Sequence, residues 1–252
     1  MKSDIDEAFT TVSKIVLGTP LKNMDNYGEW LSENVMVPST QKSAMSQTPM
    51  PIPSFIQVEK TRNLLVTLEE SLTLSGRNIG EENTGKINLQ NAPKLLKGMT
   101  FYSPEGIVGK NTELYECSTT AYSSYCYKLL YFANNKFCAF CMWPRESEYV
   151  FGCDRAFSSK TCIKCYDSLK LSRCFEVSNS TNCSDCYFCH NLENSTECMF
   201  CFNAKSLRYA IGNVQYPKEE YMKIKKIVLE EIAKKLEKDK KLELNIFNLG
   251  SK

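Results

Sequence analysis

The cysteines of this chain follow a strict spacing. All 13 lie between Cys117 and Cys201, and each of their residue numbers is a multiple of three. Counted from Cys126, blocks of twelve residues open on the same C-x-x-C position, for example CAFCMWPRESEY, CYFCHNLENSTE and CMFCFNAKSLRY. Where a cysteine is missing, a small or medium apolar residue replaces it, as at Val150 and Val177. Self-similarity at a fixed period is typical of stacked structural repeats.

The period predicts a mainly β fold, a narrow parallel β-solenoid over residues 114–213. The segment would contain about eight coils of twelve residues each. Successive coils would stack about 4.8 Å apart through parallel backbone hydrogen bonds. Every third residue would point inward, into a coil that is too short to enclose large side chains. Cysteine suits these positions because its side chain is small and often buried. We therefore expect a structural core formed by Cys117, Cys126, Cys138, Cys141, Cys153, Cys162, Cys165, Cys174, Cys186, Cys189, Cys198 and Cys201.

Three roles for these thiols are open. A disulfide needs two Cβ atoms that point toward each other, whereas side chains stacked in neighbouring coils run parallel. The number of cysteines, 13, is also odd, so they cannot all be paired within one chain. Metal binding has a matching spacing, C-x2-C-x8-C-x2-C, formed by Cys186, Cys189, Cys198 and Cys201. Valine and leucine fill the same positions elsewhere in the repeat, and neither can be a ligand. The pattern thus favours free thiols packed in the core, with a zinc or iron–sulfur site or redox-active thiols as the alternative.

Enzyme motifs are missing from the sequence. It has no phosphate-binding G-x-x-x-x-G-K-[ST], no G-x-G-x-x-G and no G-x-S-x-G. The one histidine, His190, follows Cys189, but neighbours on a strand point to opposite faces, so His190 should lie on the surface. We expect no catalytic residue and no cofactor.

Composition narrows the setting. The net charge of +2 gives no case for nucleic-acid binding. Residues 1–20 lack a signal-like apolar core, and no stretch is long and apolar enough to span a membrane. Free thiols fit a reducing compartment, so we expect the chain in the cytoplasm or in a virion.

The flanking segments differ from the repeat. Residues 1–54 should form an amphipathic helix, with Ile5, Phe9, Val12, Ile15 and Val16 on one face, followed by an extended arm over 37–54. Apolar alternation over 55–113 suggests a β-rich cap or degenerate first coils. Residues 214–252 should form an amphipathic capping helix and a docking tail.

The end of the repeat resembles a known group of proteins. Its segment N-A-K-x-x-R-Y-x-I-G-N, starting at Asn203, leads into an acidic E-E-Y helix that starts at Glu219. Over roughly residues 114–236 the chain is similar to the cysteine-rich dodecapeptide-repeat solenoid proteins of archaea, uncultured bacteria and their tailed viruses. That group has no established activity, and the resemblance implies the solenoid fold and the helix that follows it.

These parts together suggest a structural protein. A repeat rod, an arm, a docking helix and a tail are what a subunit of a larger particle needs, so residues 37–54 and 240–252 should lie against other protein subunits. The resemblance points to a virion component, such as a capsid, decoration or tail protein. Aromatic residues beside the inward positions should form a covered outer face or a protein-binding face.

Overall fold

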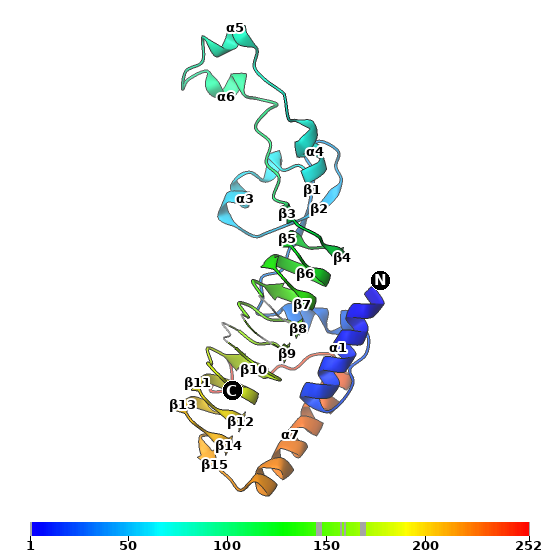
Figure 1. Cartoon of the computed structure of the whole chain (residues 1–252), viewed down its shortest axis with the longest axis vertical. Coiled ribbons are helices and arrows are strands. Elements are labelled where there is room, and N and C mark those ends of the chain that lie inside the picture. Colours follow the sequence, from blue (N-terminus) through cyan, green and yellow to red (C-terminus); the bar gives the residue numbers. More distant parts are fainter. Residues whose placement is uncertain (1, 145–147, 157, 159, 167–169, 252) are drawn as a thin grey trace.

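A computed structural model describes residues 2–144, 148–156, 158, 160–166 and 170–251. Figure 1 shows an elongated molecule, with a stack of strands in the middle, two long helices along one side and a small lobe at one end. The long helices are α1 (Lys2–Leu17) and α7 (Lys218–Asp239). No helix of the described residues is both long and apolar enough to cross a lipid bilayer.

Over the described residues, the solenoid is a single sheet of 13 strands. Its strands are β3 (Ile107–Val108), β4 (Thr112–Tyr115), β5 (Ser118–Ala121), β6 (Ser124–Ala133), β7 (Lys136–Met142), β8 (Glu148–Phe151), β9 (Lys160–Ile163), β10 (Phe175–Ser178), β11 (Ser184–Glu193), β12 (Thr196–Met199), β13 (Phe202–Lys205), β14 (Arg208–Ile211) and β15 (Val214–Gln215). Pairing is parallel at a distance of twelve residues, so Cys126 lies beside Cys138 and Cys186 beside Cys198. The predicted narrow parallel β-solenoid is confirmed.

Each coil turns at every third residue. The backbone is left-handed at these corners, with φ of 55° at Tyr125, 50° at Lys128, 56° at Phe137 and 53° at Phe140. Left-handed φ costs an L-residue about 1 to 2 kcal/mol, and the parallel hydrogen bonds of the stack have to offset that cost. Four such corners close a twelve-residue coil, which explains why only one side chain in three points inward.

The inward side chains form two main columns, defined here by their first members. The Leu114 column continues through Cys126, Cys138, Val150, Cys162, Cys174, Cys186, Cys198 and Ala210. The Cys117 column continues through Leu129, Cys141, Cys153, Cys165, Val177, Cys189 and Cys201. From Cys126 and Leu129 onward, every member of both columns is fully buried, whereas Leu114 and Cys117 are only partly buried.

An outward column of apolar side chains is covered by the flanking segments. It comprises Tyr127, Ala139, Phe151, Ile163, Phe175, Tyr187, Met199 and Ile211. Its cover consists of α1, η1 (Met24–Tyr27), α2 (Gly28–Ser32) and α7. Phe9 packs edge-on against Phe151 with ring centroids 5.2 Å apart. The aromatic face is therefore covered by the chain itself.

The two long helices follow the sequence pattern with some differences. Ile5, Phe9, Val12 and Val16 of α1 are buried, but Ile15 is 50% exposed and lies outside the apolar face. On α7 the buried face includes Tyr221. That face packs against β14 and α1, so α7 runs along the side of the solenoid (Figure 1). The end of the last coil is covered by β15, which turns back antiparallel on β14.

The segment between α2 and the solenoid departs from expectation. Residues 37–54 were expected to be an extended arm, but they form a hairpin of β1 (Ser39–Lys42) and β2 (Pro49–Ile52). Where alternation over 55–113 predicts strands, the chain mostly forms short helices: α3 (Ile56–Lys60), η2 (Arg62–Leu64), α4 (Leu68–Thr73), α5 (Glu81–Thr84) and α6 (Ala92–Leu95). Local capping decides this at α4, because Thr67 and Glu70 form a reciprocal capping box. Residues 39–106 are called the apical lobe below.

The tail also differs from expectation. Sequence alone places residues 240–252 against other subunits, whereas in the structure Leu242, Asn245 and Ile246 are buried against the same chain. Phe247 packs on Tyr166 of the solenoid, with ring centroids 5.0 Å apart. The tail is thus part of the molecule's own cover.

Candidate functional site

Twelve of the 13 cysteines are buried, and only Cys117, at the N-terminal end of the solenoid, is partly exposed. Cys126, Cys138 and Cys174 are fully buried, and all 13 cysteines are free. Burial raises the pKa of Cys138 to about 12 and that of Cys174 well above its usual range. Because the thiolate is the nucleophile and the metal ligand, Cys138 and Cys174 have little reactivity at neutral pH. Hydrogen bonds from neighbouring thiols act the other way at Cys153 and Cys201 and lower the pKa of each.

The proposed metal ligands do come together in the core. Cys186 and Cys198 are neighbours in one column, Cys189 and Cys201 are neighbours in the other, and their thiols are in contact. The columns stack these side chains in parallel, so they do not converge tetrahedrally on a point. Across the described ranges, no group of three or more His, Cys, Asp or Glu side chains is arranged to hold a metal ion.

His190 points away from the thiols. Its side chain is partly exposed, and its ring lies 6.3 Å from that of Phe202, centroid to centroid, one coil further on. Cys189 is buried on the inner side of the same strand. The two residues are neighbours in sequence without forming a nucleophile–base pair.

A buried charge cluster joins three distant segments, and the sequence analysis did not find it. The ammonium of Lys164 lies 2.9 Å from a Glu33 carboxylate oxygen and 3.4 Å from one of Glu176, and it donates to the Trp30 carbonyl at 3.0 Å. Glu176 in turn accepts the backbone N–H of Ile246 at 3.0 Å. The solenoid, the segment around α2 and the tail therefore meet at the ion pair of Lys164 and Glu176.

Burial dominates the electrostatics of this cluster. Lys164 and Glu176 are both fully buried, while the Glu33 side chain is 44% exposed. Loss of hydration raises the pKa of Glu176 to about 7, although the nearby ammonium of Lys164 opposes the shift. The only sequence signal was a lysine and a glutamate twelve residues apart at corners where Phe140 and Phe188 stand in other coils.

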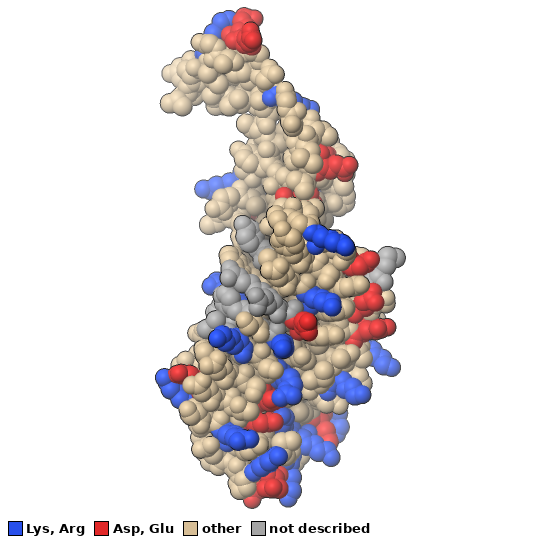
Figure 2. Space-filling view, viewed as in Figure 1, with Lys and Arg blue, Asp and Glu red and all other residues tan. Residues whose placement is uncertain are grey.

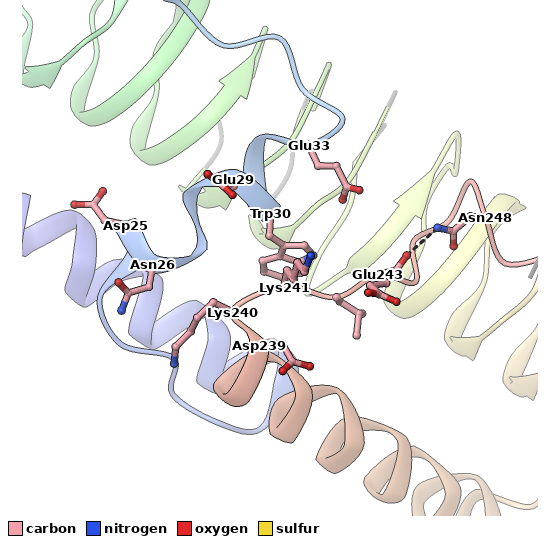
Figure 3. A pocket seen from close by; sticks show the side chains of 11 residues that line it. Asp25, Asn26, Glu29, Trp30, Glu33, Asp239, Lys240, Lys241, Glu243 and Asn248 are labelled. Atoms are coloured by element: carbon pink, nitrogen blue, oxygen red, sulfur yellow. Dashed lines mark hydrogen bonds between the residues drawn. The ribbon is translucent and has the colours of Figure 1, made fainter.

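A pocket of about 650 Å³ opens beside this cluster (Figure 3). It lies where α2, the end of α7 and the tail meet, and its side chains are mostly charged. They are Asp25, Asn26, Glu29, Trp30, Glu33, Asp239, Lys240, Lys241, Leu242, Glu243 and Asn248. The Asn248 amide donates to the Glu243 carbonyl at 2.8 Å. The pocket carries no nucleophile or base arrangement, and we regard it as the seam between the covering segments.

The apical lobe has a different surface. Its large apolar side chains are exposed: Leu89 by 96%, Ile56 by 72%, Leu72 by 68% and Ile87 by 41%. Inside it, the buried apolar residues include Met50, Ile52, Leu65 and Val66. A groove of about 690 Å³ runs along it, lined in part by Met50, Leu68 and Leu72.

The charges are distributed differently on the two parts. Figure 2 shows Lys and Arg interspersed with Asp and Glu over the solenoid and its helices, with no large area of one sign on this face. In the same view the lobe carries scattered charges of both signs, with wide areas of other residues between them. Exposed apolar side chains that lie together on such a surface are typical of a protein-binding site.

The sequence matches no protein-family model, and no curated protein matches it.

Proposed function

We propose that this chain is a structural protein that assembles with other protein subunits through its apical lobe. The observation that supports the proposal is the exposure of Leu89, Ile56 and Leu72, which no segment of the chain covers. Removing apolar surface from water stabilises association by roughly 25 cal/mol per Å², so these side chains favour contact with a partner.

The rest of the molecule suits a spacer. Parallel pairing is continuous from β3 to β14, and the covering helices bind along the solenoid rather than at one point. A stack of this kind is stiff along its axis, because each coil contacts only its neighbours and bending strains many hydrogen bonds together. The lobe would then be presented at a fixed distance from the other end of the rod.

A place in a virion, as a capsid, decoration or tail component, is the most concrete form of the proposal. Its support is the resemblance to dodecapeptide-repeat proteins, whose carriers include tailed viruses. We also propose a cytoplasmic or virion location, because free thiols fit a reducing compartment.

The alternative, a metal-binding or redox-active thiol protein, has less support. All the thiols except that of Cys117 are buried inside the coils, and the pKa of Cys138 is raised, which disfavours its thiolate. We likewise propose no enzymatic activity, since no pocket described above pairs a nucleophile with a base.

The test is the mass of the protein in solution as concentration rises. Light scattering should show association in the intact chain, and the double variant Leu72→Ser, Leu89→Ser should remove it. The matched control is Ile15→Ser, because Ile15 is also exposed, by 50%, but lies on α1 away from the lobe. An intact chain that stays monomeric at its highest soluble concentration, or a double variant that associates like the control, would contradict docking through the lobe.

A further inference from the structure

The two ends of the solenoid differ. At the C-terminal end, the Asn213 side chain accepts the N–H of Phe202 at 3.0 Å and donates to its carbonyl at 2.8 Å. The Gln215 side chain accepts the N–H of Arg208 at 3.2 Å. Together with the antiparallel turn of β15, these amides satisfy backbone groups that a further coil would otherwise bind.

The N-terminal end is closed on one half only. There β3 pairs with β5, and the Thr119 hydroxyl donates to the Pro104 carbonyl at 3.2 Å. Ser118 and Thr120 beneath this connection are 1% and 4% exposed. The other half is β4, whose only strand partner in the part of the chain that the structure describes is β6, on the lower side.

The core is open above β4. Leu114 and Cys117 head the two columns and are only partly buried, whereas Cys126 and Leu129 directly below them are fully buried. Leu114 in β4 and Cys117 just after it thus lack the full cover that the next coil up gives to the lower levels. A strand edge combined with uncovered inward side chains is the geometry to which an extended segment can add by β-augmentation.

Charge narrows the choice of occupant. Glu113 and Glu116 are exposed at the two corners of β4, and within the stack Glu116 is paired from below by Lys128, at 3.7 Å. A second copy docked edge to edge would place these two glutamates opposite their own counterparts, which is unfavourable. A strand that carries a lysine or arginine there would repeat the pairing that Lys128 makes.

We propose that the β4 edge binds an extended segment of a different polypeptide. The segment would run parallel to β4, with small or apolar side chains over Leu114 and Cys117 and a basic side chain over Glu116. This inference rests on the proposed assembly function and specifies the chemistry of one partner. It uses a surface separate from the exposed apolar side chains of the lobe.

The probe is a synthetic peptide with the sequence of residues 124–130, SYCYKLL, kept reduced. In the register of the stack it places Cys126 over Leu114, Lys128 over Glu116 and Leu129 over Cys117. Fluorescence anisotropy should show saturable binding to the intact protein, and hydrogen exchange should slow at residues 112–117. The control peptide carries Lys128→Glu.

The protein variant Glu116→Lys should weaken binding of the basic peptide by about tenfold and strengthen binding of the acidic control peptide. The variant Glu230→Lys, on the exposed side of α7, should leave both affinities unchanged. Both Glu116 and Glu230 are on the surface, so these variants should fold.

Three results would overturn the inference. The first is that the peptide shows no saturable binding. The second is that Glu116→Lys does not change peptide binding and the peptide does not slow hydrogen exchange at residues 112–117. The third is slow exchange at these residues in the concentrated protein without peptide, which would make the occupant a second copy. The lobe variants Leu72→Ser and Leu89→Ser decide the assembly proposal independently. If association through the lobe persists while β4 stays unprotected, only the edge proposal fails.

Discussion

The solenoid and the apical lobe are stabilised in different ways. In the interior of the solenoid the inward side chains are enclosed by the coil above and the coil below, and Cys162, Cys174 and Cys186 have no exposed surface. In the lobe, short helices are held by local contacts such as the capping box of Thr67 and Glu70, and Leu89 is 96% exposed. The same chain therefore contains a region dominated by burial and a region dominated by local hydrogen bonds.

The difference shows where sequence changes should matter. A substitution inside the stack disturbs two neighbouring coils as well as its own, because each column is continuous. A substitution on the lobe surface disturbs little of the fold and acts mainly on binding. Four measurements would test this contrast.

The largest effect is expected for a charge placed inside a column. Cys174→Asp buries a carboxylate that has no partner, and we expect it to destabilise the protein by about 4 to 5 kcal/mol or to prevent folding. Leu89→Asp on the lobe should change stability by less than about 0.5 kcal/mol. Urea denaturation followed by circular dichroism measures both. Equal losses for the two variants would remove the contrast.

The second effect is a pH response of opposite sign in the two regions. The pKa of Glu176 is raised to about 7, mainly by burial. The stability that protonated Glu176 contributes is therefore fully present below the pKa of the unfolded chain, near 4.5, and is lost as pH rises through 7. A shift from 4.5 to about 7 corresponds to on the order of 3 kcal/mol. Glu176→Gln should therefore flatten the loss of stability between about pH 5 and about pH 8.

In the lobe, hydrogen bonds from Ser43 and Ser46 lower the pKa of Glu70 to about 2. The stability that ionised Glu70 contributes is present above about pH 4.5 and is lost as pH falls through about 2. Glu70→Gln should flatten the acid side alone. Hydrogen exchange of the lobe and of the tail, followed against pH, separates the two responses, and a tail that loosens in acid would contradict the assignment.

The third effect concerns the contact between the solenoid and its cover. Gly152 has φ of +63°, and a Cβ there would lie 2.4 Å from the Leu31 carbonyl oxygen. Gly212 has φ of +55° with nothing within 4 Å. Gly152→Ala should cost about 2 kcal/mol more than Gly212→Ala and should loosen the segment around α2. Identical unfolding midpoints in the two variants would mean that the backbone at Gly152 is not in close contact with Leu31.

The smallest effect is expected for an apolar replacement in a column. Cys174→Val should cost less than about 1.5 kcal/mol, because Val150 and Val177 already occupy equivalent places. The same position thus gives the largest loss with aspartate and the smallest with valine. A loss as large as that of Cys174→Asp would show that the sulfur itself is required, and would favour the thiol-chemistry alternative.

The sequence predicted the repeat well because the evidence for it was internal. A period of twelve with cysteine or valine at one position specifies both register and burial, and the parallel pairing of Cys138 with Val150 follows. The corners were not predicted. Asparagine, which favours a left-handed φ, occupies several of them, such as Asn182 and Asn191, but residues as different as Tyr125 and Lys128 occupy others.

The rest depended on long-range packing that a local pattern does not contain. The alternation around Ile56 fits a strand on paper, but a half-buried strand needs a neighbour to bury its apolar face, and Ile56 is 72% exposed in a short helix. Likewise, nothing near Lys164 in sequence indicates that Glu33 and the Ile246 amide approach it. Such contacts form only after the covering segments have docked.

The corner at every third residue restricts how this molecule can change in length. An insertion of one or two residues would move every later side chain to a different side of the coil and expose a column, and an insertion of three would rotate the columns by one side. Only whole blocks of twelve keep all columns in line, and each block lengthens the stack by about 4.8 Å. The solenoid can thus serve as a ruler graduated in coils, whose span is set by the number of repeats in its gene.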